Sequence, residues 1–222
     1  MDTVFYTADV SVLEDERLFD AAYRAVSPAR QEKIDRLRVP ADKRLSLGVA
    51  LLLHDALREA GVPEERLRFT TCGEGKPCLA TGEISFNLSH SGTIAACAVS
   101  LFAIGCDVEQ VGNGGLSLAK RFFHPAEYAW LTASPDAERQ TRFYRLWTLK
   151  ESFVKATAEG MHLPLDSFCV APEGNVVPPI IRDGHLYRFA EVGDIEGYCA
   201  AVCVRDGEPL PVRRQVDLER LI

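Results

Sequence analysis

Hydrophobic residues recur at helical spacing in two long segments of the chain. In residues 41–60 they lie three and four positions apart, which gathers them on one face of a helix: Leu45, Val49, Leu52, Leu53, Ala56 and Leu57. Gly61 and Pro63 follow in the order in which helices commonly end. A longer helical pattern covers residues 137–159 and stops at Gly160. We therefore predict two long amphipathic helices, about one hundred residues apart.

Shorter patterns lie between and around these helices. Ser27-Pro28 is a typical helix start, and residues 11–25 also read as helical. Residues 116–131 are expected to form two helices separated at Pro125. Short apolar runs predict strands at 4–10, 84–88, 94–99, 103–108, 167–171, 185–190 and 198–204.

The same order of elements occurs twice along the chain. A long helix and a turn-rich stretch precede a strand of small residues, first at 94–99 (IAACAV) and again at 198–204 (YCAAVCV). This repetition predicts two related α+β halves that join near residues 103–112. We expect an N-terminal lobe of residues 1–104, a C-terminal lobe of residues 105–206 and a peripheral tail of residues 207–222.

Composition narrows the class of protein. The chain has 222 residues, 47% of them hydrophobic and 26% charged, as globular domains do. Its net charge of −7 argues against nucleic acid or an anionic membrane as the default partner. No apolar run approaches the roughly 20 residues of a membrane helix, and no secretion signal is evident. The seven cysteines show no zinc spacing. We expect buried thiols and a cytoplasmic protein.

Two acidic patterns are the first candidates for chemistry. Asp107 and Glu109 lie two apart in a predicted strand and therefore share one face of it. Glu151 and Lys155 lie four apart in the second long helix and share one face there. Neighbouring carboxylates repel unless a cation lies between them, and Mg²⁺ prefers such oxygen ligands. The alternatives are a solvated strand end and an ordinary Glu–Lys surface pair.

Two further patterns suggest anion binding. Ser89 and His90 lie where a predicted strand opens into a turn, in the run FNLSHSG, whose hydroxyls and backbone N–H groups can cradle an anion. Residues 24–44 carry seven basic and three acidic side chains, and Lys76 adds a basic turn. This excess of positive charge would attract a polyanionic ligand. A satisfied polar turn and a solubilising basic face are the alternatives.

Taken together, the runs FNLSHSG, GCDVE and WTLKESFVK resemble the 4′-phosphopantetheinyl transferases of the surfactin-synthetase-activating (Sfp) type. They begin at Phe86, Gly105 and Trp147, and the similarity covers nearly the whole chain. The runs FFHPAEY and LPLDSF, which begin at Phe122 and Leu163, also look like this family. The resemblance implies a pseudo-dimeric α+β fold of two lobes, each a small antiparallel sheet packed on a long helix, with coenzyme A in the cleft between them.

The resemblance also implies a reaction and roles. The 4′-phosphopantetheine arm of coenzyme A would move to a serine of an apo peptidyl or acyl carrier protein, with release of 3′,5′-ADP. Mg²⁺ would be held by Asp107, Glu109 and Glu151, and Lys155 would neutralise phosphate charge. Coenzyme A would be bound by Arg30, Lys33, Arg44, Lys76, Ser89, His90 and Lys155. Glu151 is our candidate for the base that takes the serine proton; Glu127 could orient a neighbouring cation or a group on the carrier side.

The sequence also suggests where a carrier protein would dock, and it leaves two alternative functions to consider. The carrier would dock near residues 158–189, where Met161, Leu163, Leu165 and Phe168 either meet it or fill the core. Two halves in one chain favour a monomer. A hydrolase built on Ser89 and His90 would leave the three carboxylates unexplained. A coenzyme A- or carrier-binding module without catalysis is the other alternative, and the intact acidic set argues against it.

Overall fold

The computed structural model describes residues 2–174, 176–207 and 211–222 and contains two lobes side by side. In the N-terminal lobe the helices are α1 (Glu16–Ala25), α2 (Pro28–Asp35) and α3 (Pro40–Glu59), and the first strands are β1 (Val4–Asp9), β2 (Phe69–Cys72), β3 (Lys76–Leu79), β4 (Ser85–Ser91) and β5 (Ile94–Ser100). The C-terminal lobe contains β6 (Ile104–Gln110), α4 (Leu116–Phe122), α5 (Pro125–Thr132), α6 (Asp136–Thr157), β7 (Ile180–Arg182), β8 (His185–Glu191) and β9 (Tyr198–Arg205). A last strand, β10 (Val212–Gln215), returns to the N-terminal lobe.

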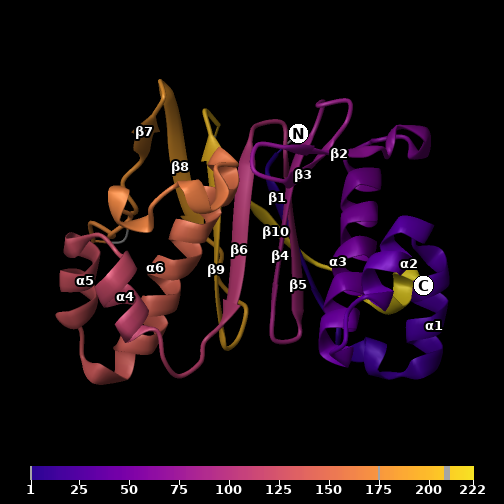
Figure 1. Cartoon of the computed structure of the whole chain (residues 1–222), viewed down its shortest axis with the longest axis horizontal. Helices are drawn as coiled ribbons and strands as arrows, with labels where there is room; N and C mark the ends of the chain where they lie inside the picture. Colours follow the sequence, from indigo (N-terminus) through magenta and orange to yellow (C-terminus); the bar gives the residue numbers. More distant parts are fainter. Residues whose placement is uncertain (1, 175, 208–210) are drawn as a thin grey trace.

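Each lobe has one four-stranded sheet, in the orders β10-β1-β5-β4 and β6-β9-β8-β7. All pairs are antiparallel except β1 with β10, which is parallel. The two sheets lie in the middle of the molecule and the long helices α3 and α6 lie outside them (Figure 1). The two alanine-rich strands of the repeat, β5 and β9, each lie inside their sheet. The expected α+β fold with two lobes is thus confirmed.

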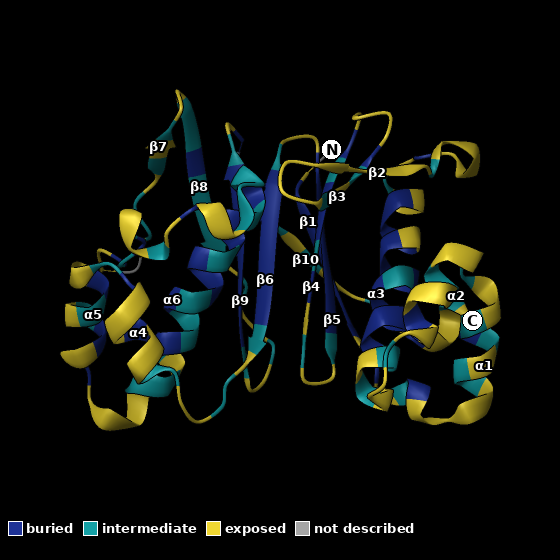
Figure 2. Cartoon of the chain, viewed as in Figure 1, coloured by how far each residue is buried: buried dark blue, intermediate teal, exposed yellow. Residues whose placement is uncertain are grey.

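Three apolar clusters form the core. One lies between α3 and the first sheet, and a second lies between α6 and the second sheet. The third joins the inner faces of the sheets and includes Phe5, Ala96, Cys106 and Val202. Because the central strands are covered on both faces, they are continuously apolar rather than alternating. Figure 2 shows this as buried strands in the middle and exposed helix surfaces at both ends.

Gly105 brings α6 directly against β6. A Cβ atom at this position would lie 2.0 Å from the carbonyl oxygen of Ser152 and 2.4 Å from the backbone nitrogen of Ala156. A larger residue would push the helix away from the strand. The glycine that precedes the Cys-Asp-Val-Glu run therefore sets the distance between the acidic strand and the helix that carries Glu151 and Lys155.

Most sequence-based elements are confirmed, including both long helices and the break at Pro125. The strand expected at residues 167–171 is wrong. Its backbone serves a buried ion pair instead: the Val170 N–H donates to Glu127 and the Phe168 carbonyl accepts from Lys150. These groups are therefore not free to pair with a neighbouring strand.

The prediction that residues 207–222 form a peripheral tail is also wrong. β10 pairs with β1, and Leu218 is buried in the N-terminal core. Residues 208–210 of this segment lie outside the described residues. No helix among the described residues is long and apolar enough to cross a membrane. Of the cysteines, four are buried, Cys78 and Cys169 are half-buried, and Cys72 is exposed, contrary to the expectation that all are buried.

Candidate active site

Three elements bring the predicted residues together where the lobes meet. β6 supplies Asp107 and Glu109, α6 supplies Glu151 and Lys155, and β4 supplies Ser89 and His90. β4 and β6 are the edge strands of their sheets and lie next to each other (Figure 1). Residues separated by up to 66 positions in the chain are therefore in direct contact.

Asp107 is the centre of this contact. Its Oδ1 accepts hydrogen bonds from Lys155 Nζ at 2.7 Å and from the Ser89 hydroxyl at 2.7 Å. Its Oδ2 is buried and has no hydrogen-bond partner among the described residues. Lys155 Nζ also approaches Ser89 Oγ, at 3.3 Å. Although burial opposes it, the negative charge of Asp107 raises the pKa of Lys155, so this side chain is a firmly charged cation.

Glu109 and Glu151 complete a group of three acids. Burial raises the pKa of Glu109; the Ser91 hydroxyl, which donates to its Oε2 at 2.7 Å, opposes the rise, and Asp107 adds to it. Burial also raises the pKa of Glu151, and the charges of Asp107 and Glu109 add to this effect. The three carboxylates thus repel one another. Within the described residues, however, no three acidic, His or Cys side chains are close enough to hold one metal ion.

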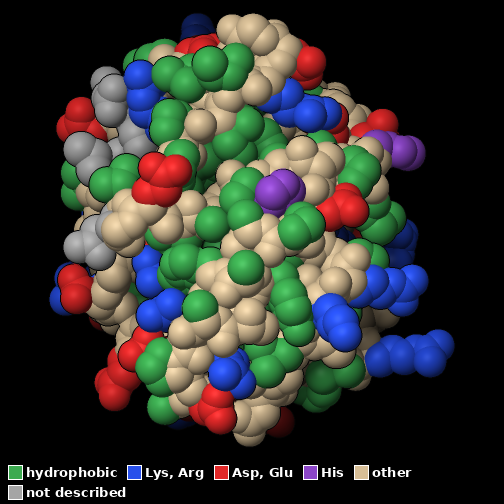
Figure 3. All heavy atoms as spheres, turned by 90° about the vertical axis from the view of Figure 1, so that its left-hand side faces the viewer, with side chains coloured by type: hydrophobic (Ala, Val, Ile, Leu, Met, Phe, Trp, Pro, Cys, Tyr) green, Lys and Arg blue, Asp and Glu red, His purple; other side chains and the backbone are tan. Residues whose placement is uncertain are grey.

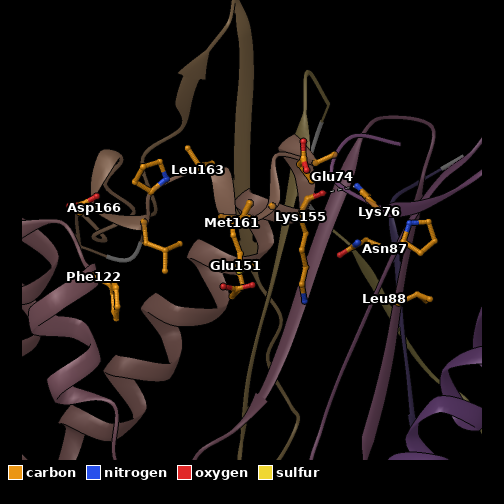
Figure 4. A pocket seen from close by; sticks show the side chains of 16 residues that line it. Glu74, Lys76, Asn87, Leu88, Phe122, Glu151, Lys155, Met161, Leu163 and Asp166 are labelled. Atoms are coloured by element: carbon orange, nitrogen blue, oxygen red, sulfur yellow. Dashed lines mark hydrogen bonds between the residues drawn. The ribbon is translucent and has the colours of Figure 1, made fainter. Parts of the chain in front are cut away.

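A cavity of about 700 Å³ opens beside this group. Glu151 and Lys155 line it from α6, whereas Lys76 and Asn87 line it from the N-terminal lobe (Figure 4). Its other walls are largely apolar and include Phe122, Val154, Met161, Leu163 and Leu165. A polar end near the acids and an apolar end near the loop after α6 suit an elongated ligand that is charged at one end.

The basic residues fall into two groups. Arg30 and Lys33 are near each other on α2: burial lowers both pKa values, and Arg30 lowers that of Lys33 further. Neither side chain forms an ion pair within the described residues. The pKa of His90 is lowered first by burial and then by the charge of Lys155; Asp42 opposes the shift and Lys33 adds a smaller lowering, so this imidazole interacts with charged groups of both lobes. A lowered pKa favours the neutral imidazole, so the positive charge in this region comes from Arg30, Lys33 and Lys155 rather than from His90.

Arg44 and Lys76 are already engaged. Arg44 pairs with Glu14 at 3.2 Å. Lys76 Nζ donates to the carbonyls of Ile104 at 2.5 Å and Lys155 at 2.8 Å, and it joins the N-terminal hairpin to β6 and α6. Burial lowers the pKa of Lys76 to about 8. Lys76, expected as a cation in a basic turn, is thus a half-buried bridge between the lobes.

Ser89 also differs from its expected role. Its hydroxyl proton is used on Asp107, and its oxygen accepts from the Val108 N–H at 3.3 Å. With only 7% of the residue exposed, the serine orients a carboxylate and has no second donor for a phosphate. Of the two neighbouring residues, His90 is the exposed one.

The sequence did not reveal the Lys150–Glu127 pair, in which both side chains are fully buried and Nζ lies 2.6 Å from Oε1. Glu127 does orient a cation, but inside the core of the C-terminal lobe. The sequence does contain a lysine at this position, Lys150, directly before Glu151. The partner of Lys150 lies on another helix, α5. In the segment after α6, Leu163 and Phe168 are buried and fill the core, whereas Met161 is fully exposed.

Comparison with known proteins gives consistent matches. Residues 103–203 match the family "4'-phosphopantetheinyl transferase superfamily", and residues 14–101 match "4'-phosphopantetheinyl transferase, N-terminal". A 4'-phosphopantetheinyl transferase of Bacillus subtilis is 36% identical over 204 residues, which cover 90% of this chain and 89% of the relative. The Sfp transferase of Bacillus subtilis strain 168 is 34% identical over the same shares. The solved holo-[acyl-carrier-protein] synthase of Thermotoga maritima aligns with a TM-score of 0.35 and 16% identity, over 48% of this chain and 64% of its own.

Proposed function

The chain belongs to the 4′-phosphopantetheinyl transferases, and from this we propose that it moves the phosphopantetheine arm of coenzyme A to a serine of an apo carrier protein, with Mg²⁺ as cofactor and 3′,5′-ADP as second product. The observation that supports this most strongly is the contact of Lys155 with Asp107, close to the charges of Glu109 and Glu151, beside an inter-lobe cavity that Glu151 and Lys155 line. Peptide-synthetase, polyketide and fatty-acid carriers all remain candidate substrates.

Asp107, Glu109 and Glu151 would hold the Mg²⁺. The buried Asp107 Oδ2 without a partner and the mutual repulsion of the three acids fit a hard divalent cation. The side chains are not gathered as a ready three-ligand group, so they would have to adjust around the ion. When bound, Mg²⁺ neutralises negative charge on phosphate oxygens.

The basic residues would bind the phosphates of coenzyme A. Lys155 is charged and lies beside Asp107, where it would stabilise charge that develops on the reacting phosphate. His90, Arg30 and Lys33 would contact the part of coenzyme A that extends away from the acids, toward its nucleotide end. Arg44 and Lys76 would contribute less, because their donors already serve Glu14 and two backbone carbonyls.

Glu151 is the proposed base for the serine hydroxyl. It lines the cavity from α6 and its carboxylate is half-buried, within reach of a ligand there. We expect Glu151→Gln at saturating Mg²⁺ to lose about 10²–10⁴-fold in kcat. If turnover stays near the wild-type value and only the Mg²⁺ requirement rises, Glu151 binds metal and is not the base.

The carrier would dock on the C-terminal lobe near residues 158–189. Met161 is fully exposed, and Phe122 is 39% exposed on the other wall of the cavity. Figure 3 faces this lobe and shows hydrophobic side chains spread between charged ones. Leu163 and Phe168 are excluded as contacts by their burial. A monomer in the cytoplasm, with no nucleic acid or membrane partner, stays our prediction.

Incubation with coenzyme A, Mg²⁺ and an apo carrier protein tests the activity. The transferase predicts a gain of about 340 Da on the carrier, the mass of one phosphopantetheine arm. A binding module without catalysis would bind coenzyme A but leave the carrier mass unchanged. A panel of apo carriers compared by kcat/KM would then identify the preferred substrate.

A further inference from the structure

The two edge strands β4 and β6 meet through side chains. They belong to different sheets, so no backbone ladder joins them. Instead, Asn87 Oδ1 accepts from the Cys106 N–H at 2.8 Å, Ser89 Oγ from the Val108 N–H at 3.3 Å and Ser91 Oγ from the Gln110 N–H at 3.1 Å. We call Asn87, Ser89 and Ser91 the polar row.

The spacing of the polar row follows from strand geometry. Every second side chain of β4 points toward β6, and every second N–H of β6 points toward β4. The two periods coincide, so one short polar side chain satisfies each of the outward N–H groups of Cys106, Val108 and Gln110. The Asn-x-Ser-x-Ser pattern of β4 thus fixes the register of β6 against it.

The two serines also donate. Ser89 Oγ donates to Asp107 Oδ1, and Ser91 Oγ donates to Glu109 Oε2, both at 2.7 Å. Each serine therefore donates to a carboxylate of β6 and accepts a hydrogen bond from the backbone N–H of the residue that follows that carboxylate on β6. The length of these two bonds is typical of a hydroxyl that donates to an ionised oxygen.

We propose that Ser91 is a positioning residue for the metal site: its hydroxyl limits how far the Glu109 carboxylate can turn, so that a smaller adjustment is needed when a divalent cation binds. This rests on the proposed function. Ser91 differs from Ser89 in what else holds the carboxylate: the ammonium of Lys155 also holds Asp107, whereas Glu109 is held by two neutral groups, the Ser91 hydroxyl and the Trp147 side chain. Since its proton is used on Glu109, Ser91 is not one of the groups that cradle a phosphate.

Three variants test this role. Ser91→Ala removes the hydroxyl, Ser91→Thr retains it, and Ser85→Ala is the matched control. Ser85 lies on the same face of β4 and is half-buried like Ser91, but it has no hydrogen bond to β6 within the described residues. The direct readout is Mn²⁺ binding, followed by electron paramagnetic resonance. The kinetic readouts are the Mg²⁺ requirement and the KM for coenzyme A at saturating Mg²⁺.

We expect Ser91→Ala to weaken Mn²⁺ binding and to raise the Mg²⁺ requirement about 10-fold or more, as losses of groups that orient metal ligands do. The KM for coenzyme A at saturating Mg²⁺ should change less than about twofold, because Ser91 is not among the described residues that line the cavity. Ser91→Thr should restore most of the Mn²⁺ affinity, and Ser85→Ala should match the wild type.

Two results with the variants would overturn the proposal: unchanged Mn²⁺ affinity in Ser91→Ala, or equal losses in Ser91→Ala and Ser91→Thr, since the hydroxyl would then be irrelevant. Wild-type protein that binds no Mn²⁺ would overturn it as well. Failure of the proposed function is distinguishable, because Mn²⁺ binding can be measured whether or not a carrier protein is modified.

Discussion

Helix α6 carries two lysines, five residues apart, that make ion pairs of nearly equal length and opposite character. Lys150 Nζ lies 2.6 Å from Glu127, and Lys155 Nζ lies 2.7 Å from Asp107. By distance alone the two pairs would be equivalent. They differ in what else surrounds each carboxylate, and this difference separates a pair whose groups are fully engaged from one that could still bind a ligand.

The Lys150–Glu127 pair is closed. Both Glu127 oxygens are used: Oε1 accepts from Lys150 and the Val170 N–H, and Oε2 accepts from the His124 N–H at 2.9 Å. The ammonium also donates to the Phe168 carbonyl and lies 4.1 Å from the centroid of the Phe168 ring. Neither side chain is exposed. Because both carboxylate oxygens are used and the pair is enclosed in the core, no ligand from solvent can reach it.

The Lys155–Asp107 pair is open. The lysine side chain is 27% exposed and lines the cavity, and Asp107 Oδ2 has no partner within the described residues. Glu109 and Glu151 add repulsion that the single ammonium does not cancel. An arrangement of this kind retains unused capacity for a cation and for phosphate oxygens. An ion pair alone therefore does not distinguish a candidate site. The distinguishing feature is a carboxylate oxygen that still has the capacity to bind a ligand.

The largest effect is expected from breaking the closed pair. Glu127→Gln leaves the Lys150 ammonium buried without its counter-charge, and we expect it to lower the free energy of unfolding by about 3–5 kcal/mol. Urea denaturation measures this loss. The turnover of the protein that remains folded should be close to that of the wild type, because neither residue touches the cavity.

The control replaces both charges, with Glu127→Leu and Lys150→Met in one chain. It should recover part of the lost stability, because no unpaired charge then remains in the core. A Glu127→Gln variant that is as stable as the wild type but turns over slowly would show that the closed pair has a functional role.

The next largest effect comes from the open pair. Asp107→Asn keeps the shape of the side chain but removes the charge, and we expect turnover to fall about 10²–10³-fold. Stability should fall by at most about 1–2 kcal/mol, because Lys155 retains contact with solvent and with the charge of Glu151. A large loss of stability in Asp107→Asn would mean that the two pairs do not differ as the structure indicates.

The sequence predicted this contrast only in part. Spacing placed Glu151 and Lys155 on one face of α6, and alternation placed Asp107 and Glu109 on one face of β6, because both follow from the local period of the chain. It did not predict that Asp107 would be 3% exposed, since the edge strand that covers it comes from the other lobe. The role of Lys150 was not predicted either, because its partner lies on a different helix, α5, and local spacing does not show which helices pack together.

Long-range pairing also explains the errors in the fold. Periodicity cannot show that β10 returns to β1, or that residues 167–171 give their backbone groups to Glu127 and Lys150. Lys76 looked like a free cation in a turn, because the carbonyls of Ile104 and Lys155 that it reaches are distant in the chain. Local pattern specified the elements, and the contacts between elements determined the roles of individual side chains.

Lys76 gives the smallest expected effect and extends the comparison to a lysine with no carboxylate partner. It donates to two carbonyls, and burial lowers its pKa to about 8 from an ordinary value of 10.5. A group with a lowered pKa in the folded protein stabilises the fold most above its unfolded pKa. That stability is lost as the pH falls through the folded pKa. A neutral amine still has two N–H groups for the two carbonyls.

We therefore expect the contribution of Lys76 to increase by about 1–2 kcal/mol between pH 8 and pH 9.5, since one proton changes stability by at most about 1.4 kcal/mol per pH unit. Other groups titrate in this range, so the measured quantity is the difference in unfolding free energy between wild type and Lys76→Met at each pH. The difference should grow in favour of the wild type as the pH rises. A difference that is constant from pH 8 to pH 9.5 would mean that Lys76 is charged throughout, and that its two carbonyl partners, like the carboxylates of Lys150 and Lys155, are sufficient to keep a buried ammonium protonated.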